Sequence, residues 1–167
     1  MADSQSNALT APAQRANSVL LKAHDDHAWR AESFAATVNA LASGGEEISP
    51  TALQAVAHEL GRCVNALTEA IHQAHEILNG RGDESDSQSN ALIESAQRAK
   101  RILLLSREYT RRAESFAATV NALASGGEEI SPTALQAVAH ELGRCVNGLT
   151  EAIHQAHEIL NGRGGEA

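Results

Sequence analysis

Aromatic residues are the scarcest class in this chain of 167 residues, which has two phenylalanines, one tryptophan and one tyrosine. Runs of Val, Ile and aromatic residues, which strands prefer, are also missing. The chain is rich instead in Ala, Leu, Glu and Gln, most of which favour helices. The composition therefore predicts an all-α fold.

Positively charged residues are few, and long apolar runs are absent. The chain has 13 Lys and Arg against 21 Asp and Glu, for a net charge of -8, which argues against a nucleic-acid partner. No apolar run approaches the about 18 residues that span a membrane, and the start, MADSQSNAL, lacks the pattern of a signal peptide. Two cysteines, Cys63 and Cys145, make no disulfide framework. We therefore expect a cytoplasmic protein with no membrane partner.

A long internal duplication is the main positive feature. Residues Ala31 to Gly82 recur at Ala113 to Gly164 with one change, from Ala66 to Gly148. Copies of an old natural duplication differ at surface positions, where drift is tolerated. This near-identity predicts an engineered or recently duplicated single-chain version of a homodimer.

The copies differ mainly in one stretch, which precedes the shared block. It reads NSVLLKAHDDHAWR from Asn17 to Arg30 and KRILLLSREYTRR from Lys100 to Arg112. A shorter echo, DSQSNAL, opens both copies further upstream. Whatever makes the two halves functionally different is expected in this unshared stretch.

Each copy predicts a helical hairpin. Its second helix begins at Ser49-Pro50, an N-cap followed by proline at the first helical position, and ends at Asn79-Gly80. Apolar residues recur between these ends at alternating spacings of three and four. The first helix is expected from near Thr10 to Ser43, and the second copy repeats both helices near residues 90–124 and 132–161.

Two such hairpins, at residues 1–82 and 91–167, are expected to bury their apolar faces as one four-helix bundle. The acidic, Ser-rich linker at residues 83–90 is too short to return along a helix of about 45 Å. We therefore predict an up-down-up-down bundle, a single-chain pseudo-dimer with a pseudo-twofold axis. Exchange of hairpins between two chains is the alternative.

Polar residues interrupt the predicted apolar face in the unshared stretch. His24 and His27 lie three apart in register with the core positions, and alignment through the shared block places Ser106 and Tyr109 at the equivalent sites. The predicted midpoints of the four helices bring His27 and Tyr109 into one central layer with Cys63 and Cys145.

Three hypotheses explain this layer. It is a buried polar layer without chemistry, whose members hydrogen-bond to one another; or His24 and His27 bind zinc or another transition metal. In the third hypothesis the layer is a pocket for a small molecule, with designed catalysis. His27 would act as general base, Tyr109 as donor, and Cys63 or Cys145 as candidate nucleophile.

One further motif lies outside this layer. Ala57-His58-Glu59-Leu60, followed by Ala66-Leu67, resembles the phosphoacceptor helix of sensor histidine kinases. The resemblance implies a histidine phosphotransfer-like bundle with His58 and its copy His140 exposed. The leading prediction remains a helical scaffold with a symmetry-broken central polar layer that binds a small ligand or metal ion.

Overall fold

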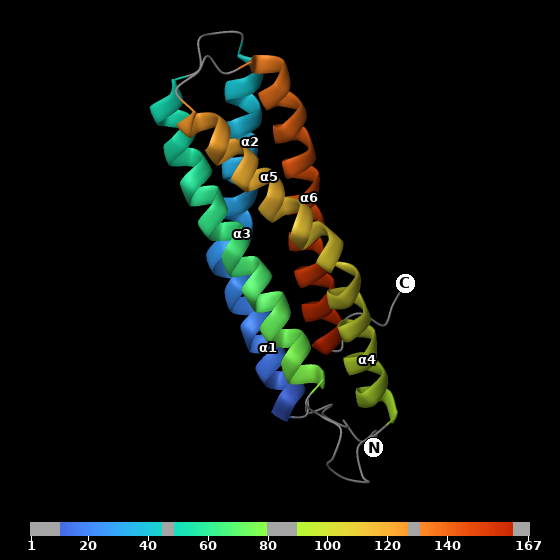
Figure 1. The fold of residues 1–167 in the computed structure, drawn as a ribbon. Coiled ribbons are helices and arrows are strands. Elements are labelled where there is room, and N and C mark those ends of the chain that lie inside the picture. The colour runs from blue at the N-terminus through green and yellow to red at the C-terminus, as the bar shows by residue number, and fades with distance from the viewer. Residues whose placement is uncertain (1–10, 45–48, 80–89, 127–130, 162–167) are drawn as a thin grey trace.

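The computed structural model describes residues 11–44, 49–79, 90–126 and 131–161, and these residues are helical almost throughout (Figure 1). The helices are α1 Ala11–Ala23, the π-helix η1 His24–Ala28, α2 Trp29–Ser43, α3 Pro50–Asn79, α4 Asn90–Leu105, α5 Arg107–Ser125 and α6 Pro132–Leu160. α1, η1 and α2 follow one another without a loop, and so do α4 and α5 across Ser106. We call these two composite helices the α1–α2 rod and the α4–α5 rod. The described residues contain no strand, so the predicted all-α class is confirmed.

Local capping sets the starts of α3 and α6. The backbone N–H of Ala134 donates to the Ser131 Oγ at 3.5 Å, and the N–H of Ala52 donates to the Ser49 Oγ at the same distance. A proline follows each serine at the first helical position, where no hydrogen-bond donor is needed. Both starts are therefore where the sequence predicts them.

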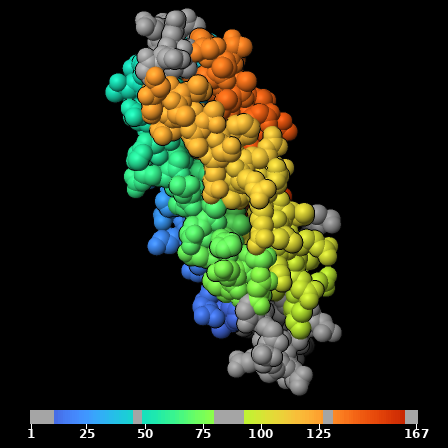
Figure 2. All heavy atoms as spheres, viewed as in Figure 1, coloured from blue at the N-terminus to red at the C-terminus, as the bar shows by residue number. Residues whose placement is uncertain are grey.

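The α1–α2 rod, α3, the α4–α5 rod and α6 are the four rods of a four-helix bundle. Along the chain they alternate in direction, and each lies beside the next (Figure 1). The α1–α2 rod packs on α3 and α6, and the α4–α5 rod packs on the same two helices. Few residues of α3 touch α6. The two rods therefore occupy opposite corners of the bundle, with α4 and α5 crossing the front in Figure 2.

Leucine, valine and alanine fill the interior. The largest fully buried side chains come from all four rods, and they include Leu20, Leu60, Leu103 and Leu142. Alanines at Ala31 and other inward positions allow the helix backbones to approach one another closely. A closed apolar core of this kind stabilises the bundle by removing apolar surface from water.

Most predicted helix boundaries agree with the observed ones to within a residue or two. The prediction of an uninterrupted first helix is wrong, because η1 interrupts the α1–α2 rod at His24–Ala28. The predicted linker is residues 83–90; its last residue, Asn90, begins α4, and the rest lies outside the described residues, as do the loops at 45–48 and 127–130. Within the described residues, no helix is both long enough and apolar enough to cross a membrane.

Candidate functional site

The π-helix η1 lies in the unshared stretch and accommodates one extra residue. Asp3 of the upstream echo recurs 83 positions later, at Asp86, whereas Ala31 of the shared block recurs 82 positions later, at Ala113. Copy 1 therefore contains one more residue than copy 2 between these points. A π turn holds an inserted residue without breaking the helix, because its hydrogen bonds reach one residue further.

The extra residue moves both predicted site histidines away from the core. Ala23 and Ala28 are the buried residues of this region, whereas His24 and His27 are only half-buried. The prediction that both histidines face the core is therefore wrong. The error arose because α-helical spacing was continued through this region, whereas the π-helix η1 shifts the register. Counted from the upstream echo, Ser106 corresponds to Ala23.

His24 lies at the surface between η1 and α6. Its ring centroid is 5.9 Å from that of His154, and its Nδ1 is 3.6 Å from an Oδ1 of Asp25. Nowhere in the described part of the chain do three or more His, Cys, Asp or Glu side chains gather closely enough to hold a metal ion. The metal site predicted at His24 and His27 is therefore not supported.

Ser106 occupies a core position, as predicted, but its hydroxyl is hydrogen-bonded within its own helix. The side chain is buried, and its hydroxyl donates to the backbone carbonyl of Leu103 at 2.8 Å. A serine hydroxyl that bonds to the preceding turn commonly bends a helix. This bond coincides with the break between α4 and α5.

Tyr109 lies outside the core, where 44% of its surface is exposed, so its predicted core position is also wrong. Its ring lies against Gly148 of α6. A Cβ added at Gly148 would lie 2.9 Å from both Cγ and Cδ1 of Tyr109, closer than carbon atoms approach in proteins. The single change in the shared block, Ala66 to Gly148, thus stands where the tyrosine ring needs the space.

Cys63 and Cys145 lie in the core, as predicted for central positions of α3 and α6. Burial raises the pKa of both thiols, although the nearby Arg30 and Arg112 lower it in part. The thiolate is the reactive form of cysteine, so a raised pKa leaves these side chains poor nucleophiles at neutral pH.

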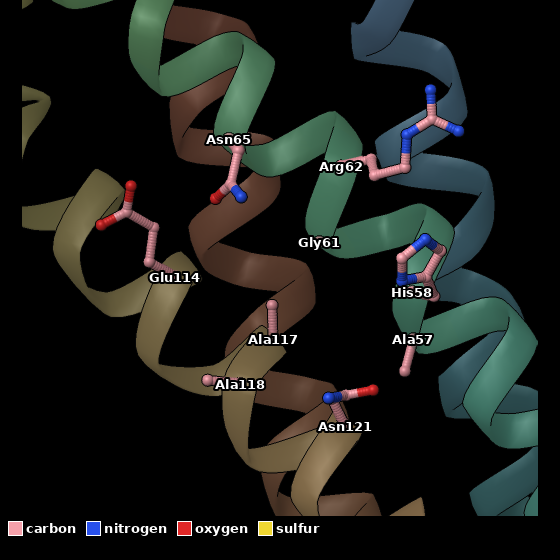
Figure 3. A pocket seen from close by; sticks show the side chains of 9 residues that line it. All are labelled: Ala57, His58, Gly61, Arg62, Asn65, Glu114, Ala117, Ala118 and Asn121. Carbon is pink, nitrogen blue, oxygen red and sulfur yellow. The ribbon is translucent and has the colours of Figure 1, made fainter.

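Two surface grooves of similar size lie between the rods. One, of about 260 Å³, lies between α3 and α5, and its lining includes His58, Gly61, Arg62, Asn65 and Glu114 (Figure 3). The other, of about 250 Å³, lies between α6 and α2. Every residue lining the second groove is the copy of a residue lining the first.

The two grooves contain the histidines of the motif that resembles the phosphoacceptor helix of sensor histidine kinases. His58 and His140 are exposed, one in each groove, in agreement with their predicted outward orientation. Arg62 points away from Asn65 and Glu114 (Figure 3), and its Nη1 is 3.2 Å from the Glu59 Oε1. The groove is thus open beside the imidazole, with the nearest guanidinium already paired.

Two other histidines were not predicted from the sequence as site residues. His75 is buried, with its Nδ1 3.0 Å from the Asn79 Nδ2 and 3.5 Å from the Arg107 Nη2. Burial lowers the pKa of His75, and Arg107 and Lys100 lower it further. The pKa of His157, its copy in α6, is lowered by burial as well. Their position on the flank of the apolar stripe was the available signal.

Comparison with models of protein families gives no match to this chain, and comparisons with curated proteins and with solved structures give none either.

Proposed function

We propose that this protein is a duplicated, single-chain helical scaffold, in which two near-identical hairpins pack as a pseudo-dimer and present the same groove twice. In this proposal the residues that break the symmetry adjust packing, and the core performs no chemistry. The observation that carries the proposal is the contact between Tyr109 and Gly148. Tyr109 belongs to the unshared stretch and Gly148 is the one change in the shared block, so a single packing contact links the two differences between the copies.

Repeated contacts support the pseudo-symmetric arrangement. Glu59 pairs with Arg30 at 3.5 Å and with Arg62 at 3.2 Å. Its copy Glu141 pairs with Arg112 at 3.0 Å and with Arg144 at 3.2 Å. Exposed ion pairs contribute little stability, so their value here is as markers of equivalent geometry in the two halves.

The same geometry gives little support to catalysis in the central layer. Both cysteine thiols are buried with raised pKa values, and Tyr109 is turned to the surface against Gly148. A general base, a donor and a nucleophile must lie within hydrogen-bond reach of one substrate. No such grouping of His27 with Tyr109 and a cysteine occurs among the described contacts.

Calorimetry of the full chain tests the scaffold proposal. A single bundle should unfold in one cooperative transition, with equal calorimetric and van't Hoff enthalpies. Adding zinc or cobalt should leave the melting temperature unchanged, and His27→Ala should do the same. Two separate transitions, or a metal-dependent rise in melting temperature, would contradict the proposal.

Histidine phosphotransfer is the second candidate, favoured by the exposure of His58 and His140 in matching grooves. A phosphoryl acceptor must be reachable by a donor, and both imidazoles meet that condition. Incubation of the chain with acetyl phosphate should then give acid-labile phosphate, which His58→Gln combined with His140→Gln should remove. His72→Gln is the matched control, because His72 is also exposed on α3. Absence of acid-labile phosphate in the parent chain would rule this candidate out.

A further inference from the structure

The contacts of the buried His75 require a neutral imidazole. Only 8% of its surface is exposed, and its Nδ1 lies 3.0 Å from the Asn79 Nδ2 and 3.5 Å from the Arg107 Nη2. A guanidinium has only N–H donors, so Nδ1 must be the acceptor in the contact with Arg107. A protonated imidazole has no acceptor. Asn79 can turn its carboxamide oxygen towards a protonated ring, but Arg107 has no acceptor to offer, so protonation removes this hydrogen bond.

Positive charge around His75 also opposes its protonation. Arg107 and Lys100 act on it from the α4–α5 rod, and His72 and Glu76 act on it from α3. Burial is the main cause that lowers the pKa of His75, followed by Arg107 and Lys100, and among these groups Glu76 alone raises it. An imidazolium at this position would be buried beside two permanent cations, with one carboxylate to offset them.

The helix that carries Lys100, α4, is held in the bundle by few side chains. Among the α4 residues whose burial is described, those that are buried are Ala96, Ala99 and Leu103. Ile102 is partly buried against the same core. Three other large apolar side chains of α4 are exposed to solvent, at Ile93, Leu104 and Leu105. Because two of the three buried side chains are single methyl groups, α4 gains little apolar burial from docking, and local opening is favoured in segments of this kind.

A break in the α4–α5 rod lies beside the His75 contact. Ser106 separates α4 from α5, and its ψ angle of -12° departs from the about -42° of an α-helix. Arg107 is the next residue and the first of α5. Segments that move as rigid bodies commonly turn at a few residues where elements end. Ser106 therefore gives α4 a point of rotation next to a partner of His75.

We propose that α4 is an acid-released flap, which turns outward at Ser106 when His75 takes up a proton. The rotation carries Lys100 away from His75, frees Arg107 from the ring and gives the imidazolium access to water. The rest of the bundle stays folded, since α5, α6, α3 and the α1–α2 rod keep their own contacts with one another.

The direction of the pH effect follows from the two states of His75. With α4 docked, burial and the neighbouring cations hold the pKa of His75 below the ordinary histidine value of about 6.5. With α4 turned outward, solvation returns the pKa towards that value, so this state binds more protons in mild acid. Docking of α4 is therefore strongest above pH about 6.5 and weakens as the pH falls towards the lower value.

The other half of the molecule contains a matched control, His157, which is the copy of His75. Its Nε2 lies 2.9 Å from the Asn161 Nδ2. The charged groups that affect its pKa lie on η1 and α6 and are His24, Asp25, His154 and Glu158. They include two carboxylates and neither Lys nor Arg, so a proton at His157 meets offsetting charge. Acid is therefore expected to release α4 and to leave α1, the equivalent helix of the first copy, docked.

Hydrogen exchange of the full chain at pH 7.5 and 5.5 tests the proposal, with rates expressed as protection factors so that the intrinsic pH dependence of exchange cancels. Protection in α4 should fall by up to about tenfold for each pH unit below 6.5, the limit set by the uptake of one proton. Protection in α1 should fall less. Unchanged protection in α4, or equal losses in α1 and α4, would overturn the proposal.

Three single variants assign the effect to His75. His75→Gln should keep α4 protected at pH 5.5, because a carboxamide accepts a hydrogen bond from Arg107 without taking up a proton. Arg107→Gln, a change at an exposed position, should reduce the loss of protection in acid and serves if His75→Gln folds poorly. His157→Gln should lose protection in α4 as the parent chain does. A full acid response in both His75→Gln and Arg107→Gln, or its disappearance in His157→Gln, would show that His75 does not control α4.

Discussion

At the scale of single residues, the contact between Tyr109 and Gly148 explains the only change in the shared block. A glycine inside a helix is less favourable than alanine by about 1 kcal/mol. The structure shows what offsets this penalty, since the aromatic ring occupies the space that a methyl group would fill. In α3, Ala66 stands at the equivalent position.

We predict that Gly148→Ala lowers the free energy of unfolding by about 1–3 kcal/mol, although alanine is the better helix former. The reason is that a methyl group there forces the Tyr109 ring or α6 to move. Urea unfolding followed by circular dichroism measures the change.

The control for this prediction is the same substitution with the ring removed. Gly148→Ala in a Tyr109→Ala background should be stabilising, by up to about 1 kcal/mol, because only helix propensity then remains. Equal effects of Gly148→Ala in the two backgrounds would show that the ring and the glycine are not coupled.

At the scale of secondary-structure elements, the two composite rods differ in how they pass through the unshared stretch. The α1–α2 rod accommodates its extra residue in η1, whereas the α4–α5 rod is interrupted at Ser106. Both keep the residues on either side in register with the core. Leu20 and Ala31 are buried in the first rod, and Leu103 and Ala113 are buried in the second.

We predict that deleting Asp25 is tolerated. The deletion removes the extra residue, so the π turn reverts to α-helix and the core registers on both sides are preserved. The melting temperature should change by no more than about 4–8 °C, equivalent to roughly 1 kcal/mol in a small domain.

Deletion of Glu108, in contrast to deletion of Asp25, is expected to destabilise the bundle. The α4–α5 rod has no extra residue there, so the deletion rotates one end of the rod away from the core. We expect this variant to lose most of its cooperative unfolding in the same thermal scan. If both deletions destabilise the chain equally, η1 does not serve to absorb an insertion.

At the scale of the whole molecule, the pKa values of His75 and His157 depend on charged groups from other rods of the bundle. His75 faces Arg107 and Lys100 of the α4–α5 rod, with His72 and Glu76 nearby on α3. The pKa of His157 is affected by His24 and Asp25 of the α1–α2 rod, and by His154 and Glu158 on α6. Both histidines have a lowered pKa, mainly because of burial.

These lowered pKa values predict a loss of stability in mild acid. The unfolded chain, in which histidine has a pKa of about 6.5, binds more protons than the folded bundle below that pH. The contribution of His75 and His157 is therefore complete above pH about 6.5 and decreases as the pH falls towards their lower folded-state values. Urea unfolding at pH 7.5 and 5.5 measures the difference.

The variant His75→Gln with His157→Gln should show a smaller loss between the two pH values, because neither position can then take up a proton. An unchanged pH dependence in this double variant would assign the effect to other groups. Stability that rises as the pH falls would contradict the direction of both pKa shifts.

The amino-acid sequence by itself determined the helices and much of their packing. Ser49-Pro50 and Ser131-Pro132 act through hydrogen bonds within a few residues, so their effect does not depend on the rest of the fold. The three- and four-residue spacing of apolar side chains is likewise a property of one helix, and it predicted the burial of α3 and α6 correctly.

Only the tertiary structure decided the features of the candidate site. The extra residue of the first copy could form a loop or the π-helix η1, and Tyr109 could enter the core or lie over Gly148. The outcome depends on which register packs best against the facing helices. Packing energies of this kind sum over many weak contacts between distant residues, and no local pattern contains them. The positions of His24 and His27 were predicted wrongly because α-helical spacing was continued through η1, whose π turn only the packing reveals.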